Sequence, residues 1–239
     1  MEFTKTLIKG KLVKRYKRFF ADIKVNKETI VAHCPNTGSM KGLLNINNEV
    51  WISKNEDPKR KLKYTLEIIK VKKNLVGVNT HFANKIVYHG LSNNLIKELN
   101  NNQNIKPEVF FNKETRFDFL VKKNNQKIFV EVKNVTLFRK DKISEFPDAI
   151  TSRGSKHLKT LIDATKKGYK SYIIFLVQIQ GMKYFKIAKD IDKEYYQNYL
   201  LAKKAGVKFL AYRCKIDPTK EIKIEKKLKI IDVQLFREI

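Results

Sequence analysis

The sequence has little cysteine and no long apolar run, and both absences narrow the class of protein. Its two cysteines, Cys34 and Cys214, are far apart and lack the spacing of a metal-binding cluster. No apolar stretch approaches the roughly 18 residues that a membrane-spanning helix needs. The first residues also lack the apolar core of a signal peptide. We therefore expect a soluble, cytoplasmic protein with reduced thiols and no membrane partner.

Negative charge is also scarce. The 239 residues carry 51 Lys+Arg against 24 Asp+Glu, a formal net charge of +27. Such an excess suits a polyanionic partner, and nucleic acid is the first candidate. Only eight of the basic residues are Arg, and Asn and Ile are abundant, so an AT-rich coding bias accounts for part of the lysine content. The charge supports nucleic-acid binding without establishing it.

Two adjacent segments, Thr115–Val121 and Ile128–Val135, have the composition of strands. Both are rich in β-branched and aromatic residues, and the polar tract Lys122–Lys127 between them contains the turn-forming pair Asn124-Asn125. We expect the two strands to pair as a hairpin. Alternation predicts two faces for the first strand, with Phe117, Phe119 and Val121 on one and Arg116, Asp118 and Leu120 on the other.

Three charged residues in these strands predict a metal-dependent site. In a hairpin, Asp118 can meet Glu131 and Lys133, which share one face of the second strand. This pattern resembles the core of the PD-(D/E)XK nuclease superfamily. Two carboxylates can hold Mg²⁺, which stabilises charge on a phosphate, and the lysine can orient water or offset developing charge. The alternative is an exposed edge strand with cross-strand ion pairs.

Residues 1 to about 80 predict a small β-domain. About five strand-like segments alternate with turn signals and fit an OB-like barrel: Leu7–Lys24, Glu28–His33, Glu49–Ser53, Lys61–Lys72 and Leu75–Asn79. Arg15, Lys17 and Arg18 could bind phosphates beside the aromatic pair Phe19 and Phe20. Alternatively one of these rings lies in the core and the cations are only solvated.

A turn-rich loop at residues 32–44 contains small hydrogen-bonding side chains. Asn36, Thr37 and Ser39, together with the backbone amides around them, could bind an anion such as phosphate. His33 beside Cys34 invites the hypothesis of a nucleophilic pair. Adjacent strand residues face opposite ways, so we do not expect one.

From about residue 81 the sequence alternates helices and strands. We expect helices at Asn84–Tyr88, Ser92–Leu99, Ser155–Lys167 and Ile191–Ala205, and strands at Tyr172–Gln178, Lys183–Ala188, Val207–Ile216 and Glu221–Leu235, with a turn-rich connection at Thr136–Arg153. Arg153, Lys156 and His157 surround a helix N-terminus, which favours anions. Glu98 could be a third site carboxylate or simply face solvent. Gln178 could reach the site from the end of a buried strand.

Seven motifs occur in an order that closely resembles the sugar fermentation stimulation protein (SfsA) family. They are Arg-Tyr-Lys-Arg-Phe-Phe-Ala-Asp at 15–22, Ala-His-Cys-Pro-Asn-Thr-Gly-Ser-Met at 32–40, Val-Gly-Val-Asn-Thr-His at 76–81, Arg-Phe-Asp-Phe-Leu at 116–120, Val-Glu-Val-Lys-Asn-Val-Thr-Leu at 130–137, Phe-Pro-Asp-Ala at 146–149 and Thr-x-Arg-Gly-x-Lys-His-Leu at 151–158.

This resemblance implies an α/β (α+β) protein of two domains. Residues 1–80 would form the OB-like barrel, and residues 81–239 a PD-(D/E)XK nuclease-like mixed sheet flanked by helices. It also implies sequence-nonspecific DNA binding, a regulatory link to maltose metabolism, and site roles for Asp118, Glu131 and Lys133. A helix-turn-helix proposed near the C-terminus of the family does not fit Lys193–Lys215, which has the pattern of a helix, Gly206 and a strand.

Two function hypotheses from different classes follow. The first is a DNA nuclease in which Asp118 and Glu131 bind Mg²⁺ or Mn²⁺ and Lys133 lies beside the attacking water. The second is a non-catalytic DNA-binding regulator on the same scaffold. The DNA could be double- or single-stranded, and RNA is a third, less favoured partner because an OB-like barrel does not by itself select DNA.

Overall fold

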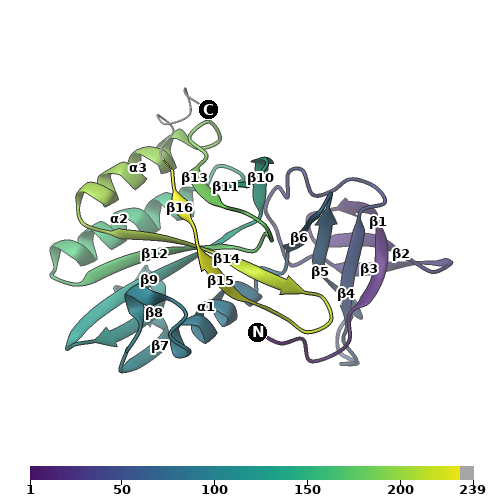
Figure 1. Ribbon diagram of the computed structural model, residues 1–239, viewed down its shortest axis with the longest axis horizontal. Helices are drawn as coiled ribbons and strands as arrows, with labels where there is room; N and C mark the ends of the chain where they lie inside the picture. The colour runs from purple at the N-terminus through teal and green to yellow at the C-terminus, as the bar shows by residue number, and fades with distance from the viewer. Residues whose placement is uncertain (232–239) are drawn as a thin grey trace.

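The N-terminal part of the chain is a closed β-barrel. The computed structural model describes residues 1–231, and Figure 1 shows the barrel beside a larger domain. The strands of its sheet are β1 (Ile8–Tyr16), β2 (Phe20–Val25), β3 (Glu28–His33), β4 (Glu49–Lys54), β5 (Tyr64–Val71) and β6 (Asn74–Gly77). Their order is β3-β2-β1-β4-β5-β6, and a parallel pairing of Ala32 with Tyr64 joins β3 to β5. The predicted small β-barrel is confirmed, and the segment Leu7–Lys24 forms two of its strands, β1 and β2.

Strand β5 is buried on both faces, which explains its continuous apolar run. Leu66 and Ile69 pack into the barrel core, whereas Ile68 joins the core of the second domain. A strand that is covered on both sides needs no polar face. The barrel and the second domain therefore share this strand as a common wall.

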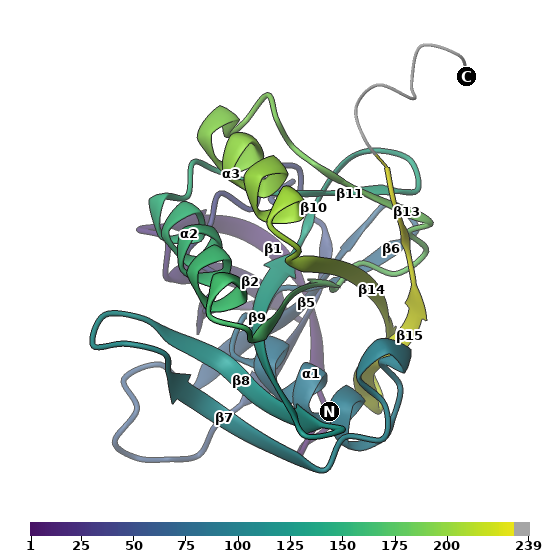
Figure 2. The same ribbon diagram turned by 90° about the vertical axis from the view of Figure 1, so that its left-hand side faces the viewer.

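The second domain is built on a mixed six-stranded sheet with helices on both faces. Its strands, in spatial order, are β15 (Glu221–Lys227), β14 (Lys208–Asp217), β12 (Lys170–Val177), β9 (Gln126–Val135), β8 (Arg116–Lys123) and β7 (Asn104–Phe110). Strands β9, β12 and β14 are parallel. Helix α1 (Phe82–Ser92) covers one face, and α2 (Ser152–Lys166) with α3 (Lys193–Lys204) covers the other (Figure 2). The expected mixed sheet flanked by helices is confirmed.

A small third sheet was not expected from the sequence. It contains β10 (Leu137–Lys140), β11 (Ile143–Phe146), β13 (Tyr184–Ile187) and β16 (Lys229–Ile230). The first two of these strands lie in the segment that we predicted to be a turn-rich connection, and that prediction is wrong. Each is only four residues long, and their charged hairpin turn, Asp141-Lys142, hides the alternation that identifies a strand.

Three further predictions need correction or completion. The helix expected at Ser92–Leu99 does not form, because α1 ends at Ser92 and only a short 3₁₀ turn, Lys97–Leu99, follows. Strand β7 was missed because Pro107 and several charged residues mask it. At the C-terminus β15 and β16 lie within the predicted strand, and residues 232–235 of that prediction are outside the described residues.

Main-chain hydrogen bonds hold the two domains together. Strand β6 continues across the boundary, where Gly77 N donates to Gln178 O and Gln180 N donates to Leu75 O. A Cβ on Gly77 would lie 2.7 Å from Gln178 Oε1 and 3.1 Å from Ile222 Cδ1, so any other residue here would have to displace these side chains. The N-terminal amino group also donates to Ile222 O on β15. The domains therefore form a continuous hydrogen-bonded structure.

Helix α3 leads directly into strand β14, so the structure has no helix-turn-helix at Lys193–Lys215. Across residues 1–231, no helix has the length and apolar character needed to cross a membrane.

Candidate functional site

Asp118 lies where strands β8 and β9 separate. The regular pairing of the two strands ends at Phe119 and Val130, next to Asp118. Beyond this point the Asp118 side chain replaces the main chain as the partner of β9, because Val132 N donates to Asp118 Oδ2 at 2.7 Å. Asn84 on α1 donates to Asp118 Oδ1 at 2.7 Å. Both carboxylate oxygens are thus fixed in position.

The separation of the strands also corrects the predicted faces of β8. The sequence placed Phe117, Phe119 and Val121 on the same face. Phe119 and Val121 do pack together on the α1 side of the sheet, but Phe117 packs with Phe129 in the core on the α2 side. Simple alternation fails because the strand is irregular at Asp118. This irregularity points the carboxylate toward β9, instead of burying it under a helix.

Glu131, Lys133 and His157 form a buried polar cluster next to Asp118, on the α2 face of β9. Lys133 Nζ donates to Glu131 Oε1 at 2.7 Å and lies 3.5 Å from His157 Nδ1. His157 Nδ1 also contacts Glu131 Oε1 directly. We call these four residues the carboxylate site. They converge as the sequence predicted, with His157 supplied by the second turn of α2.

The electrostatics distinguish the two carboxylates. Burial, followed by the nearby charge of Glu131, raises the pKa of Asp118 to about 6. Burial also acts to raise the pKa of Glu131, but the Lys133 charge and the His157 hydrogen bond outweigh it and hold that pKa below the ordinary value. Near neutral pH, Glu131 is an anion paired with the Lys133 ammonium group, whereas Asp118 is close to its titration range.

One oxygen of the site lacks a partner. Glu131 Oε2 is buried and, among the residues that the structure describes, no group donates to it. A buried carboxylate oxygen without a donor is costly. A divalent cation or a water molecule would satisfy this oxygen. The two carboxylates are close enough for the charge of Glu131 to raise the pKa of Asp118. Two carboxylates fit a cation such as Mg²⁺, which keeps several of its waters and binds substrate phosphate.

Within the described residues no group of three or more His, Cys, Asp and Glu side chains is arranged to hold a metal ion. A cation at this site would therefore depend on two carboxylates, with water or substrate as its other ligands. That arrangement fits Mg²⁺ or Mn²⁺ better than zinc, which binds three or four protein ligands.

The carboxylate site opens into a cleft that contains cations. The cleft is lined by Asn84, Glu108, Phe110, Glu114, Thr115, Arg116, Asp118, Arg153, Lys156 and His157. Lys156 pairs with Glu114 at 2.8 Å, and Arg116 pairs with Glu108 at 2.8 Å. Arg153 is exposed in the first turn of α2, at the helix end that favours anions. Arg153 is therefore the better placed of the two predicted phosphate contacts.

Asn84 and Tyr195 were not identified from the sequence. Asn84 fixes Asp118, and the Tyr195 hydroxyl is buried without a partner among the described residues. Burial, followed by the charge of Glu131, raises the pKa of Tyr195, which places this ring near the site. The sequence carried one weak signal for each. Asn84 follows the Val-Gly-Val-Asn-Thr-His motif, and Tyr195 lies one helical turn after the capping residue Asp192.

Two predicted additional site residues lie elsewhere. Glu98 accepts a hydrogen bond from Tyr212 Oη at 2.7 Å and contacts Lys227, and its carbonyl accepts from Lys123 at the far end of β8. Gln178 is fully buried at the domain boundary and donates to Asn134 Oδ1 at 2.7 Å. Neither belongs to the carboxylate site, because Glu98 lies beside the end of β8 that is distant from Asp118 and Gln178 is used in contacts at the domain boundary.

In the barrel, three of the six predicted nucleic-acid contacts have structural roles. Arg15 Nη2 donates to the carbonyls of Arg18, Asn36 and Gly38 at 2.9–3.1 Å. Asn36 is buried, and its Oδ1 accepts from Gly38 N. Ser39 Oγ donates to Asp148 O and Oδ2 in the second domain. Arg15 and Asn36 therefore stabilise the loop, and Ser39 connects the domains.

Lys17, Arg18 and Thr37 remain exposed and available to a ligand. Phe19 is 46% exposed at the β1–β2 turn and Phe20 stacks on Tyr16, so neither ring enters the barrel core. Cys34 is buried, and burial raises the pKa of its thiol, so it is not an activated nucleophile.

Comparison with known proteins gives a consistent result along the chain. Residues 13–78 match the family model described as the SfsA N-terminal OB domain, and residues 81–220 match the sugar fermentation stimulation protein RE domain. The sugar fermentation stimulation protein homolog of Pelagibacter ubique is 78% identical over 232 residues, covering 97% of this chain and all of that protein. The homolog of a Marinomonas species is 41% identical, covering 97% of this chain and 90% of that protein.

A solved structure agrees with these matches at the level of the fold. The structure of Pyrococcus furiosus SfsA in complex with Ca²⁺ superimposes with a TM-score of 0.87, covers 97% of this chain and 98% of that one, and is 23% identical in sequence. The family models and the relatives together establish that the chain belongs to the sugar fermentation stimulation protein (SfsA) family.

Proposed function

We propose that the protein is a metal-dependent nuclease that hydrolyses phosphodiester bonds in DNA. The observation that carries this proposal is the buried pair Asp118 and Glu131. One oxygen of Glu131 has no donor among the described residues, and Lys133 is fixed beside the other. Burying two neighbouring carboxylates is costly unless cations compensate them, and Lys133 pairs with only one oxygen of Glu131, which supports a place for a further cation here.

Asp118 and Glu131 would hold Mg²⁺ or Mn²⁺. Such a cation, when bound, supplies positive charge that offsets the charge developing on a phosphate during hydrolysis. The Ca²⁺ complex of Pyrococcus furiosus SfsA supports uptake of a divalent cation by this fold. Ca²⁺ and Mg²⁺ both prefer oxygen ligands, as two carboxylates provide.

The other residues of the site have separate roles in this proposal. Asn84 and the amide of Val132 orient the two oxygens of Asp118. Lys133 keeps Glu131 ionised and places an ammonium group where negative charge develops. His157 shares the same oxygen of Glu131 and limits its rotation. Preorganised charge of this kind lowers a reaction barrier without rearrangement during the reaction.

DNA is favoured as the substrate by the charge of the chain and by the composition of the cleft. The net charge of +27 attracts polyanions, and Arg153 and Lys156 lie at the opening of the site. The electrostatic term predicts that affinity falls steeply with salt. Competition between DNA and RNA of equal length would test the choice of polymer.

Cleavage assays test the proposal directly. Supercoiled plasmid and single-stranded DNA are incubated with the protein and Mg²⁺, Mn²⁺ or a chelator. We expect metal-dependent cleavage by the parent, none with chelator, and none by Asp118→Ala. Glu114→Ala is the matched control, because it removes an exposed carboxylate from the same cleft and should retain activity. Cleavage that survives in Asp118→Ala would refute the assigned site.

The second candidate function is a non-catalytic DNA-binding regulator of sugar metabolism on the same scaffold. The specific observation in its favour is that Lys133 and His157 already compensate Glu131 without a metal. Under this hypothesis no metal supports cleavage. Asp118→Ala would then leave DNA affinity unchanged or increase it, because one anion that repels phosphate has been removed.

A further inference from the structure

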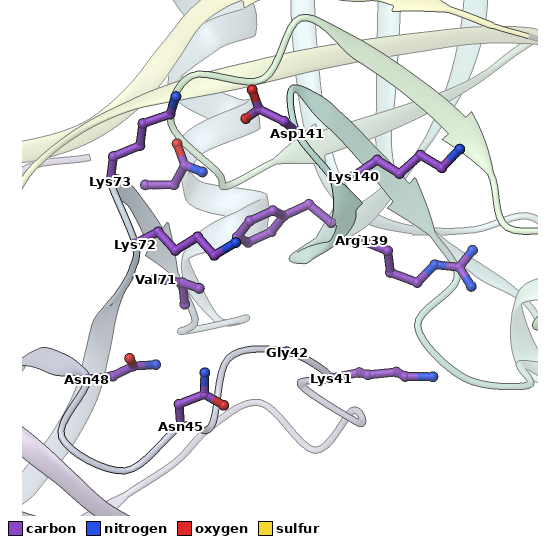
Figure 3. A pocket seen from close by; sticks show the side chains of 12 residues that line it. Lys41, Gly42, Asn45, Asn48, Val71, Lys72, Lys73, Arg139, Lys140 and Asp141 are labelled. Atoms are coloured by element: carbon purple, nitrogen blue, oxygen red, sulfur yellow. The ribbon is translucent and has the colours of Figure 1, made fainter. Parts of the chain in front are cut away.

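A second cleft lies at the junction of the two domains and carries positive charge. It is lined by Lys41, Gly42, Asn45, Asn48, Val71, Lys72, Lys73, Asn74, Phe138, Arg139, Lys140 and Asp141, and we call it the junction cleft. Figure 3 shows Lys72 extending across it, with Lys41, Arg139 and Lys140 projecting toward one side. The barrel supplies one wall and the β10–β11 hairpin the other. Nothing in the proposed chemistry uses these residues.

Most of these cations are not neutralised within the protein. Arg139 pairs with Glu145 and Asp190, and Asp141 lies 4.0 Å from Lys142. In the part of the chain that the structure describes, Lys41, Lys72, Lys73 and Lys140 form no ion pair. All four are exposed. Four unpaired cations around one concave surface, with a single carboxylate among them, favour an anionic ligand.

The backbone of the β5–β6 hairpin places two of these lysines at its tip. Val71 pairs with Asn74, so Lys72 and Lys73 form a two-residue turn, and Lys72 has a φ of 52°. Asparagine takes the same positive-φ position in the β2–β3 turn, at Asn26, and Lys17 and Lys142 show that lysine also takes such positions elsewhere in the chain. Lys72 and Lys73 therefore lie at the exposed tip of the hairpin, where their side chains can reach a ligand.

A third cleft has lining residues close in sequence to those of the other two. Ser39, whose hydroxyl accepts a hydrogen bond from Lys41 N, lines it together with Arg18 and Thr151. Two residues after Thr151, Arg153 lines the cleft of the carboxylate site. Exposed cations, Arg18 and Arg153, thus line these two other clefts as well.

We infer that the junction cleft binds the sugar-phosphate backbone of a single-stranded segment of the nucleic acid whose phosphodiester is cleaved at the carboxylate site. This inference rests on the proposed function. A single strand is favoured over a duplex because the cleft also presents Phe138, which is half-buried, and the amides of Asn45 and Asn48, which face it in Figure 3. Aromatic rings stack on unpaired bases, and amides bond to base edges.

The test uses a variant that removes charge and fits the backbone of the turn. Lys72→Asn/Lys73→Gly deletes two cations, and asparagine and glycine both tolerate positive φ, so the hairpin should keep its conformation. A parental thermal unfolding midpoint would show that a loss of binding is not caused by misfolding. Fluorescence anisotropy measures the affinity for single-stranded DNA of about 30 nucleotides as salt is varied. We expect affinity to fall roughly tenfold near 0.1 M salt, and the slope of log K against log salt to decrease by about 1.4, or 0.7 for each lost phosphate contact.

A matched control removes two lysines from a different hairpin. Lys122→Gln/Lys127→Gln changes a pair at the distal end of β8 and β9, and should leave affinity and salt slope at the parental values. An equal loss in this control would show that only net charge matters and would overturn the inference. Unchanged binding by Lys72→Asn/Lys73→Gly would overturn it as well. A loss for duplex DNA as large as that for single strands would contradict the choice of a single strand.

Two further measurements, binding of a short oligonucleotide and cleavage of DNA, distinguish a failure of this inference from a failure of the proposed function. An oligonucleotide of about 6 nucleotides, within the span of a single binding site, should lose less affinity in the variant than the long strand does. If the parent cleaves DNA but the variant binds it normally, only the inference about the junction cleft fails. If the parent binds through Lys72 and Lys73 but cleaves under no condition, the proposed nuclease activity fails and the binding surface remains.

Discussion

The carboxylate site and the junction cleft handle charge in opposite ways. In the carboxylate site, Asp118 and Glu131 are held by hydrogen bonds and by Lys133, and Glu131 is 3% exposed. In the junction cleft the lysines are exposed, and within the described residues they form no ion pair. Buried charge interacts strongly and with fixed geometry, whereas exposed charge is weakened by water and salt. The first arrangement suits chemistry, and the second suits retention of a long polyanion.

The largest expected effect concerns the carboxylate site. Glu131→Gln keeps the shape of the side chain but removes a carboxylate, so cation binding and compensation by Lys133 are both lost. We expect the single-turnover rate of DNA cleavage to fall by roughly a thousandfold, as for the loss of one preorganised electrostatic group. Glu114→Gln, at an exposed position of the same cleft, is the control. Parental rates in a folded Glu131→Gln protein would rule out the assignment.

The next prediction concerns stability. Lys133→Met leaves Glu131 buried with His157 as its remaining compensating partner. Breaking a buried ion pair from one side costs about 3–5 kcal/mol of unfolding free energy. Urea denaturation at neutral pH measures this loss. Lys127→Met, at an exposed position of the same strand, should change the unfolding free energy by less than about 0.5 kcal/mol. Equal losses of unfolding free energy in the two variants would show that the buried Lys133 contributes no more to stability than the exposed Lys127.

The unfolding free energy should depend on pH through the titration of the buried Asp118 carboxyl group. Its pKa of about 6 in the folded protein lies above the ordinary value of 3.8, so the native state binds more protons than the unfolded state between these values. Stability should therefore fall as pH rises from about 4 to about 6, by on the order of 3 kcal/mol, and then level off.

Urea unfolding in chelator, across this pH range, would compare the parent with Asp118→Asn. The substituted protein lacks the titrating group and should not show this component of the fall in stability. Parallel curves for the two proteins would contradict the raised pKa of Asp118.

The smallest expected effect concerns an exposed aromatic ring of the barrel. Phe19 is 46% exposed at the β1–β2 turn beside Lys17 and Arg18, where it could stack on an unpaired base. Phe19→Ala should weaken single-strand binding by about 1 kcal/mol without changing the salt slope, because no charge is lost. Leu201→Ala, an exposed apolar residue on α3, is the control in the same anisotropy assay. A parental affinity for Phe19→Ala would exclude stacking at this turn.

Much of the fold could be predicted because its signals are local. The barrel strands, the two site strands and helices α2 and α3 all have periodic apolar positions bounded by turn residues or capping residues. Short or charged strands such as β7 and β10 could not be predicted in this way. Their stability comes from pairing with the strands that follow them, β8 and β11, and not from their own composition.

The sequence by itself determined the family, the barrel and the pairing of Asp118 with Glu131 and Lys133. Charged residues inside apolar strands are conspicuous, and alternation places Glu131 and Lys133 on a common face of β9. Only the tertiary structure decided that Asn84 holds Asp118, that Glu98 and Gln178 lie elsewhere, and that Arg15 is used within the barrel. It also created the junction cleft, which neither domain contains alone. Such contacts join segments that lie far apart in the chain, and no local pattern encodes them.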